Sequence, residues 1–339
     1  MKRFLITLTI LAVLLAACSA GTSTPPAVTP SAAPAITAVD LTASPLPVPA
    51  TSTPSMAKVL LVVPDLTSAD AKNAMNHITG LASSSSLTVT TLTALTAAVL
   101  TPEVSIVVLL TAPDNLNDLL AAAPKVQFVA LGLPGLEPRP NLSLITQQTE
   151  QAAFVAGFIA TIISEDWRSA GLLPDSPASL KDAFLNGGRY FCGRCIPIHG
   201  PIVAFPLATA LPASSSLADW TSAVTQLQTK ILETVYVDPS VSSPDLLSLL
   251  AKQNLALVGG LVPPAELKSQ WAATVSSDVW TPLAALWPGL VAGAGNKTVS
   301  AAIQVTDINP SLLTPGKQRL MQDVITGLQT GTIGPLTIQ

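Results

Sequence analysis

The chain has 339 residues, of which 49% are hydrophobic and 11% are charged, and it carries a formal net charge of −4 with a pI of about 5.1. This length allows two compact domains, and the apolar content excludes disorder for the bulk of the chain. The acidic balance, without runs of Lys or Arg between aromatics, gives nucleic-acid binding no support. We therefore expect a globular body that binds no nucleic acid.

The N-terminus resembles a bacterial lipoprotein signal. Lys2 and Arg3 precede an apolar stretch at 4–14 that is too short to span a bilayer, and residues 15–18 read Leu-Ala-Ala-Cys. In such signals the cysteine thiol accepts a diacylglyceryl group and the cysteine becomes the first mature residue. We predict that residues 1–17 are a signal peptide and that Cys18 anchors the protein to the extracytoplasmic face of the cell membrane. The alternative is an ordinary secretory signal with Cys18 near the cut by chance.

Residues 18–57 are dominated by Pro, Ala, Ser and Thr, with eight prolines between positions 25 and 54. Such a segment buries too little surface to offset its chain entropy, and the prolines favour an extended conformation. We predict a tether between the lipidated cysteine and the folded body. Composition leaves O-glycosylation of the tether open.

From Lys58 onward, short apolar runs alternate with stretches of helical spacing. The expected strands in the first part are residues 59–63, 87–92, 104–110, 126–131 and 141–145, and the expected helices are 69–81 and 114–122. Strands that are apolar on both faces and alternate with helices indicate a parallel sheet covered on both sides.

The alternation restarts at residue 149. The expected helices there are 149–163, 179–191, 217–230 and 244–252, and the expected strands are 168–173, 201–206, 231–237 and 255–260. Further segments follow at 271–275, 278–291, 299–305 and 314–330. Gly157, in the middle of the first of these helices, costs about 1 kcal/mol relative to Ala, which suggests that another backbone passes close to it.

The predicted fold class is α/β, with two doubly wound Rossmann-like lobes joined by a hinge of several crossovers. Lobe one takes residues 58–146 plus about 265–339, and lobe two takes residues 147–264. Sheets of this kind bind ligands in a cleft at the carboxyl ends of their strands.

Three segments of the chain match motifs of a known family: VQFVA at 126–130, Asn141-Leu142 and the segment 148–160. They are similar to the "V-x-F-x-x-x", "P-N-V" and "E-x-A-F-L-A-G-Y-x-A" of the basic membrane protein family, the PnrA-like substrate-binding lipoproteins of ABC importers. Asn309-Pro310 and the glycine-containing C-terminal segment 325–333 are similar to its closing motifs. Membership implies a type I periplasmic-binding-protein-like fold that closes on a small ligand, often a purine nucleoside, and delivers it to ABC permease subunits.

The sequence departs from the family where the family contacts its ligand. Residues 68–73 read SADAKN, with Lys72 in place of the aromatic of "N-D-x-S-F-N". Residues 259–263 read GGLVP and contain neither carboxylate of "G-x-D-x-D-Q". The lysine of "S-x-x-K" has no counterpart near 276–278. The sequence thus leaves two classes of ligand, a nucleoside or another polar solute.

The candidate ligand contacts are polar residues that follow the predicted strands, together with two aromatic residues for an apolar wall. These candidates are Asp65, Thr67, Ser68, Thr111, Asp114, Asp175, Ser176 and Asp238, with Phe154 and Phe184 as the wall. The alternative is structural: Asp114, Asp175 and Ser176 would be helix N-caps, and Asp65 and Asp238 would be turn residues beside proline.

Cys192 and Cys195 form a C-x-x-C pair after a predicted helix. In an exported protein the simplest interpretation is a local disulfide. A thioredoxin-like role would place the pair at a helix start, and a zinc site made with His199 would need a fourth ligand, for which only His77 or a distant carboxylate is available.

The sequence contains no G-x-S-x-G elbow, P-loop or H-E-x-x-H motif. We therefore expect no enzyme, no metal and no cofactor, and a monomer whose partners are a small ligand, a permease and, through its anchor, the membrane. The alternatives are a sensory or ligand-free surface lipoprotein of the same fold and, with least support, a surface hydrolase.

Overall fold

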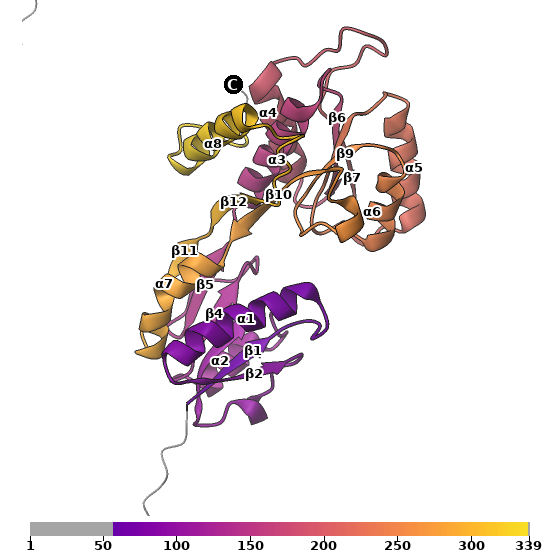
Figure 1. The fold of residues 1–339 in the computed structure, drawn as a ribbon. Coiled ribbons are helices and arrows are strands. Elements are labelled where there is room, and N and C mark those ends of the chain that lie inside the picture. Colours follow the sequence, from indigo (N-terminus) through magenta and orange to yellow (C-terminus); the bar gives the residue numbers. More distant parts are fainter. Residues whose placement is uncertain (1–56, 338–339) are drawn as a thin grey trace, which may run out of the picture. The chain divides into compact units, whose positions relative to one another are not determined.

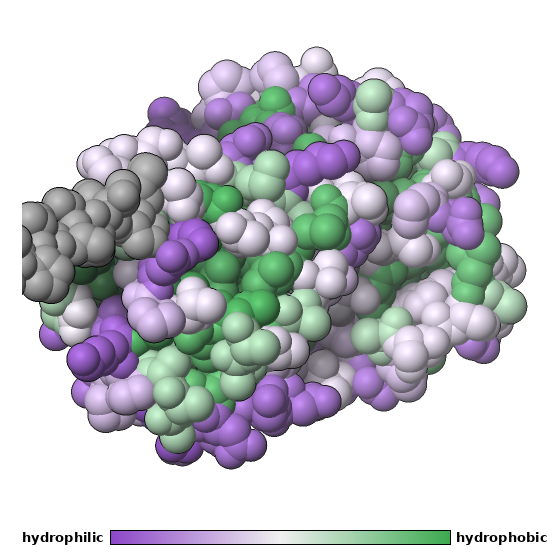
Figure 2. Space-filling view, turned by 90° about the horizontal axis from the view of Figure 1, so that it is seen from below, coloured by the Kyte–Doolittle hydropathy of each residue, from purple (hydrophilic) through white to green (hydrophobic). Residues whose placement is uncertain are grey.

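The computed structural model of the chain describes residues 57–337, so the predicted signal peptide, Cys18 and nearly all of the tether lie outside the described residues. The described residues form twelve strands in two six-stranded sheets (Figure 1). None of their helices is long and apolar enough to cross a membrane. Figure 2 shows apolar residues between hydrophilic ones on one face, in keeping with the low charge content.

The first sheet is parallel throughout, with strand order β11-β5-β4-β3-β1-β2. Its strands are β1 (Lys58–Val62), β2 (Thr88–Leu92), β3 (Val104–Leu109), β4 (Gln127–Leu131), β5 (Leu142–Thr146) and β11 (Thr298–Ser300). Helices α1 (Ala69–Ser84) and α7 (Trp280–Val291) pack on one face with Val59 and Leu61 of β1. Helix α2 (Leu116–Ala122) packs on the other face with Leu60 and Val62. Successive side chains of β1 thus point into opposite cores, as the period of a strand requires.

The second sheet has the strand order β12-β10-β9-β8-β6-β7, and only β12 runs antiparallel. Its strands are β6 (Ser169–Pro174), β7 (Leu207–Leu211), β8 (Thr234–Val237), β9 (Ala256–Gly259), β10 (Trp271–Asp278) and β12 (Ala302–Thr306). One apolar cluster on this sheet contains α3 (Thr149–Ile163), α4 (Ser179–Cys192) and α8 (Pro315–Gln329). A second contains α5 (Leu217–Gln228) and α6 (Pro244–Ala251). Short 3-10 turns lie at Ala97–Val99 and Ala265–Leu267.

The C-terminal part of the chain is shared between the lobes, which corrects the expectation that residues from about 265 onward belong to lobe one. Only α7 and β11 join the first lobe, whereas β10, β12 and α8 complete the second (Figure 1). The physical reason is hydrogen bonding: β10 pairs with β9, and β12 pairs with β10, from Thr274↔Thr306 to Asp278↔Ala302.

Three chain crossovers therefore join the lobes, between β5 and α3, between β10 and α7, and between β11 and β12. Hydrogen bonds link these crossovers to one another. The amide of Gln148 donates to Ser277 Oγ at 3.3 Å, and the amide of Ala301 donates to the carbonyl of Thr146 at 2.8 Å. The hydroxyls of Thr146 and Ser300 lie 3.3 Å apart. The hinge is thus a set of linked strands.

One predicted strand is wrong in position. Residues 201–206 form no strand, and β7 begins at Leu207 instead, because Phe205 is buried in the core beneath the guanidinium of Arg168. The segment 299–305, to which the sequence assigned no element type, is divided at Ala301 into β11 and β12, which belong to different sheets.

Helices α3 and α4 touch through their backbones. A Cβ on Gly157 of α3 would lie 2.0 Å from the carbonyl oxygen of Phe184, and a Cβ on Gly187 of α4 would lie 1.9 Å from that of Phe154. The close backbone approach predicted from Gly157 is confirmed. These two helices form the centre of the second lobe's core.

Candidate functional site

A cavity of about 590 Å³ lies at the carboxyl ends of the strands and is lined by residues of both lobes. This volume falls within the range typical of small-molecule sites. Its first-lobe side includes Asp65 after β1 and Leu133 after β4; its second-lobe side includes Asp238 after β8 and Leu261 after β9. Gln147 and Ser277 line it from the crossovers.

On the first-lobe side, the loop after β1 is ordered by its own side chains. The carboxylate of Asp65 accepts hydrogen bonds from the amide of Thr67 at 2.8 Å and from its hydroxyl, and these bonds lower the pKa of Asp65. Ser68 caps α1 by accepting a hydrogen bond from the amide of Ala71 at 3.1 Å. Asp65 therefore presents a fixed negative charge at the cavity.

On the second-lobe side, Tyr236 and Asp238 form a buried pair. The Tyr236 hydroxyl donates to Asp238 Oδ2 at 3.3 Å, and the amide and hydroxyl of Ser240 donate to Oδ1 at 3.0 and 2.7 Å. Burial, followed by the charge of Asp238 and this hydrogen bond, raises the pKa of Tyr236 well above 10. The Tyr236 ring stacks on Phe184, with centroids 5.6 Å apart, so the pair is held from below by the core.

Trp280, the first residue of α7, provides an aromatic side to the cavity. Its indole stacks on the imidazole of His77, which comes from α1 and does not line the cavity. Asp278 fixes the start of α7 by accepting hydrogen bonds from the amides of Trp280 and Thr281 at 3.0 and 3.1 Å. Trp280 is therefore held both by its backbone and by one face of its ring.

The crossovers supply uncharged polar groups. Gln147 packs its amide over Gly132, where a Cβ would lie 2.5 Å from Nε2. Gln304 Nε2 donates to Ser276 Oγ at 3.2 Å. These side chains can accept or donate hydrogen bonds, so they suit a ligand that carries hydroxyl or amide groups.

The ionisable groups that line the cavity are acidic, apart from the phenol of Tyr236. They are Asp65, Asp70 and Asp238, and no Lys, Arg or His of the described residues lines it. A cavity with this charge disfavours an anionic ligand.

The structure brings together some of the predicted contact residues. Asp65, Ser68 and Asp238 line the cavity, whereas the other polar candidates, Thr67, Thr111, Asp114, Asp175 and Ser176, do not. The alternative role of N-caps is not observed either, since Asn115 and Ala178 occupy the cap positions of α2 and α4.

The two predicted wall residues lie outside the cavity. Phe184 is fully buried against Tyr236, and Phe154 is buried at 1% exposure in the α3–α4 core. Phe154 instead reaches a separate depression of about 300 Å³, beside Arg189 and Arg194. Tyr236 and Trp280 line the cavity but were not among the predicted contacts. The available signal was the place of Tyr236 near the end of the predicted strand 231–237 and of Trp280 near the start of the segment 278–291.

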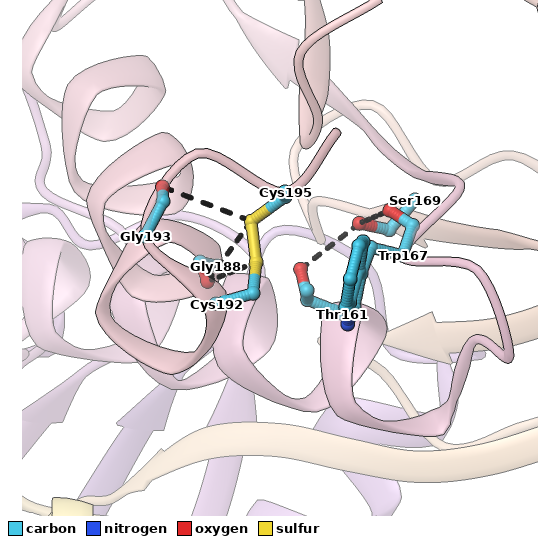
Figure 3. Close-up of a disulfide and its surroundings, with 7 residues drawn as sticks. All are labelled: Thr161, Trp167, Ser169, Gly188, Cys192, Gly193 and Cys195. Atoms are coloured by element: carbon cyan, nitrogen blue, oxygen red, sulfur yellow. Dashed lines mark hydrogen bonds between the residues drawn. A yellow bond between two sulfur atoms is a disulfide. The ribbon is translucent and has the colours of Figure 1, made fainter. Parts of the chain in front are cut away.

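Cys192 and Cys195 are joined by a disulfide with a Cα–Cα distance of 5.1 Å (Figure 3). Cys192 ends α4, and Cys195 lies in the loop that follows. The predicted local disulfide is confirmed, and the pair lies apart from the cavity lining.

No known sequence family matches the chain, and no curated protein matches it. Solved structures share its fold. One is an ABC transporter solute-binding protein from Conexibacter woesei DSM 14684, with 17% identity over 82% of this chain and 98% of that chain and a TM-score of 0.61. A second solute-binding protein of an ABC transporter system, from Aeropyrum pernix K1, has 14% identity over 82% and 92% of the two chains and a TM-score of 0.60.

A transcriptional activator of the comK gene from Bacillus halodurans is similar to the same degree, with 13% identity over 81% of this chain and 98% of that chain and a TM-score of 0.62. At these identities the likeness shows the fold alone. The predicted fold class, two α/β lobes of the periplasmic-binding-protein type, is confirmed. The relationship to the basic membrane protein family stays a prediction.

Proposed function

We propose that the protein is a lipid-anchored substrate-binding protein of an ABC importer, which captures a small polar solute outside the cytoplasm. The observation that carries this proposal is the cavity of about 590 Å³, lined from both lobes at the carboxyl ends of their strands. It adjoins the three linked crossovers, so a change in the angle between the lobes would open or close it. Closure on the solute would give the permease a shape to recognise.

The lining narrows the class of solute. Three aspartates and no cationic side chain favour an uncharged polyhydroxyl compound or a cation over an anion. Trp280 offers an aromatic face to a sugar ring, a base or an ammonium group. Gly260, Leu261 and Val262 line the cavity where the resembled family places carboxylates, so a nucleoside would need other hydroxyl partners here.

The shared fold also occurs in regulators, and the N-terminus is what favours transport over regulation inside the cell. A lipoprotein-like signal followed by a proline-rich tether suits a protein that works at the extracytoplasmic face of the cell membrane. The second candidate, a ligand-free or sensory surface lipoprotein, is favoured by the absence of the family's ligand-binding carboxylates at 259–263.

A thermal-shift screen tests solute capture. Nucleosides, neutral sugars, cationic amino acids and polyamines form the test set, and dicarboxylates and sugar phosphates serve as the anionic control set. A solute at one hundred times its Kd adds about 2.7 kcal/mol of stability. We expect a hit in the first set and none in the second; stabilisation by no solute at all would favour the ligand-free alternative.

The anchor has a separate test. Cys18→Ser should yield protein that no longer fractionates with membranes, because the thiol that accepts the lipid is gone. Metabolic labelling with a fatty acid should mark the parent protein and not the variant. Membrane retention of a processed, unlabelled Cys18→Ser protein would refute lipid anchoring.

A further inference from the structure

The last turn of α4 and the loop that joins it to β7 display an unusual number of apolar side chains. Fourteen large hydrophobic residues are exposed in the described chain, and five of them fall within residues 190–202. They are Tyr190, Phe191, Ile196, Ile198 and Ile202, with 41%, 40%, 43%, 79% and 61% of their surface exposed. We call these five residues the apolar loop surface. Single exposed apolar residues are ordinary, whereas a contiguous exposed apolar patch is typical of an interaction site.

The loop backbone is nevertheless firmly held. The disulfide closes its first turn (Figure 3), and the amide of Phe205 donates to the carbonyl of Cys195 at 3.0 Å. Arg168, only 4% exposed, donates hydrogen bonds to the carbonyls of His199 and Gly200. The amide of Ile198 donates to Asp166 Oδ1 at 3.1 Å.

This scaffold separates two kinds of residue. Cys195, Pro197 and Phe205 point into the protein and are buried, whereas Ile198 and Ile202 stay in water. The hydrogen bonds from the buried Arg168 to two loop carbonyls fix the backbone conformation of the loop. The exposed isoleucines are therefore presented at defined positions, without a partner in the described part of the chain.

The same segment is cationic in an acidic protein. Residues 189–202 contain Arg189, Arg194 and His199 and no acidic residue, while the chain has a net charge of −4. Both arginines are exposed, and neither takes part in the ion pairs found among residues 57–337. Apolar side chains beside free cations suit an anionic bilayer, whose headgroups attract arginine and whose interface accepts apolar groups.

The loop lies at the opposite end of the second sheet from the cavity, so a surface contact there would leave the cavity free. It precedes β7 and so meets the amino ends of the second sheet's strands, whereas the cavity is at their carboxyl ends. Contact through the loop would thus not obstruct the solute.

We propose that the apolar loop surface, with Arg189 and Arg194, is a second membrane contact that docks the body on an anionic lipid bilayer. The proposed lipid anchor at Cys18 would keep the bilayer close, so a weak contact suffices. The docking itself depends on neither the anchor nor the solute, and its test can be made without both.

The test uses a protein that begins at Thr53, since Thr53–Gln339 is one compact unit that holds every strand and apolar cluster of the described residues. Binding is measured by flotation with protein-free vesicles of phosphatidylcholine, with and without phosphatidylglycerol. We expect binding only to vesicles with phosphatidylglycerol. Arg189→Glu and Arg194→Glu should each weaken it at least about fivefold. Ile198→Ser with Ile202→Ser should weaken it at least about tenfold.

Leu320→Ser is the matched control, because Leu320 is an apolar residue of α8 with 45% exposure outside the loop, and it should bind like the parent. An unchanged melting temperature shows that each variant is folded. Failure of the parent to bind anionic vesicles, or equal binding by the double isoleucine variant, overturns the proposal. Binding only to native membranes that contain protein, and not to protein-free vesicles, assigns the surface to a protein partner and also overturns it.

Discussion

The imidazole ring of His77 lies parallel to the indole ring of Trp280, with centroids 4.6 Å apart and an angle of 6° between the planes. The two residues lie 203 positions apart in the sequence, on α1 and α7, which pack on the same face of the first sheet. Only Trp280 lines the cavity, so His77 supports the indole from the side away from it. We therefore regard Trp280 as a contact residue and His77 as a positioning residue.

The first prediction concerns this stacked pair. Trp280→Ala should lower the affinity for a solute found in the screen by about tenfold or more, because a large aromatic contact is lost. His77→Ala should lower it by only about threefold, since the indole remains but loses its support. Isothermal titration calorimetry measures both, and Trp280→Phe should restore part of the loss. An affinity unaffected by Trp280→Ala would remove Trp280 from the site.

The second prediction concerns the backbone contact of α3 and α4. Gly157→Ala places a methyl group 2.0 Å from the Phe184 carbonyl oxygen, so the helices must separate. We expect a loss of about 2 kcal/mol or more in the free energy of unfolding, measured by urea denaturation.

The matched control for this prediction is Gly80→Ala. Gly80 is also inside a helix, α1, but an added Cβ there meets nothing within 4 Å. Its replacement should stabilise the protein by about 0.5–1 kcal/mol, because Ala is the better helix former. Equal effects of the two substitutions would mean that helix propensity, and not the helix contact, decides the outcome at Gly157.

Most elements of the fold could be predicted because their signals are local. The helix predicted at 149–163 coincides with α3, since its apolar spacing spans the whole element. The strands β1, β3 and β4 are continuous apolar runs that are buried on both faces, and each was predicted within one residue of its observed bounds.

The predictions fail where contacts with a distant part of the chain determine the local structure. The apolar segment 201–206 matches a strand in composition, but Phe205 lies beneath the guanidinium of Arg168 and its amide donates to the carbonyl of Cys195, so the segment is held as a loop. The division of 299–305 at Ala301 follows from pairing with two different sheets, which no local pattern reveals.

The cavity was predicted in place but only in part by residue. Position after a strand identified Asp65 and Asp238, because strand ends meet at one edge of a parallel sheet. The sequence pattern does not reveal that Tyr236 covers Phe184, because this contact depends on how α4 packs against β8. Trp280 was missed because the segment 278–291 was expected only to complete lobe one, with no part in the cavity.

The third prediction is a loss of stability in acid through Asp278. Burial alone would raise the pKa of Asp278, but hydrogen bonds from Thr281 and Trp280 and the charge of His77 outweigh it, so the pKa lies below 3.8. A lowered folded-state pKa stabilises the protein above the unfolded-state value, and this contribution is lost as the pH falls through the folded-state value. Asp278→Ala should therefore cost about 1 kcal/mol at neutral pH and progressively less below about pH 4.

The measurement for this prediction is guanidinium chloride denaturation of both proteins over a range of pH. Asp278→Asn provides the control, because it retains an acceptor for the α7 amides but cannot titrate. Its stability difference from Asp278→Ala should not vary with pH. A parent-to-alanine difference that stays constant down to about pH 2 would rule out the carboxylate as the source.

The fourth prediction concerns alkaline pH and the Tyr236–Asp238 pair. Burial raises the pKa of Tyr236 well above 10, and the charge of Asp238 adds to the effect. A raised folded-state pKa means that the stabilisation is fully present below the unfolded-state value of about 10 and is lost as the pH rises further. Tyr236→Phe removes this loss, while the ring can still stack on Phe184.

At neutral pH, Tyr236→Phe should cost only about 1 kcal/mol, because Asp238 keeps its hydrogen bonds from Ser240. The deficit of the variant should then shrink above about pH 10, since only the parent has a buried phenol to ionise. Guanidinium chloride denaturation between about pH 7 and pH 11 measures this difference. Tyr190→Phe, at a phenol with 41% exposure, is the matched control. A Tyr236→Phe deficit that does not change with pH would show that the phenol is not shielded from water as the structure requires.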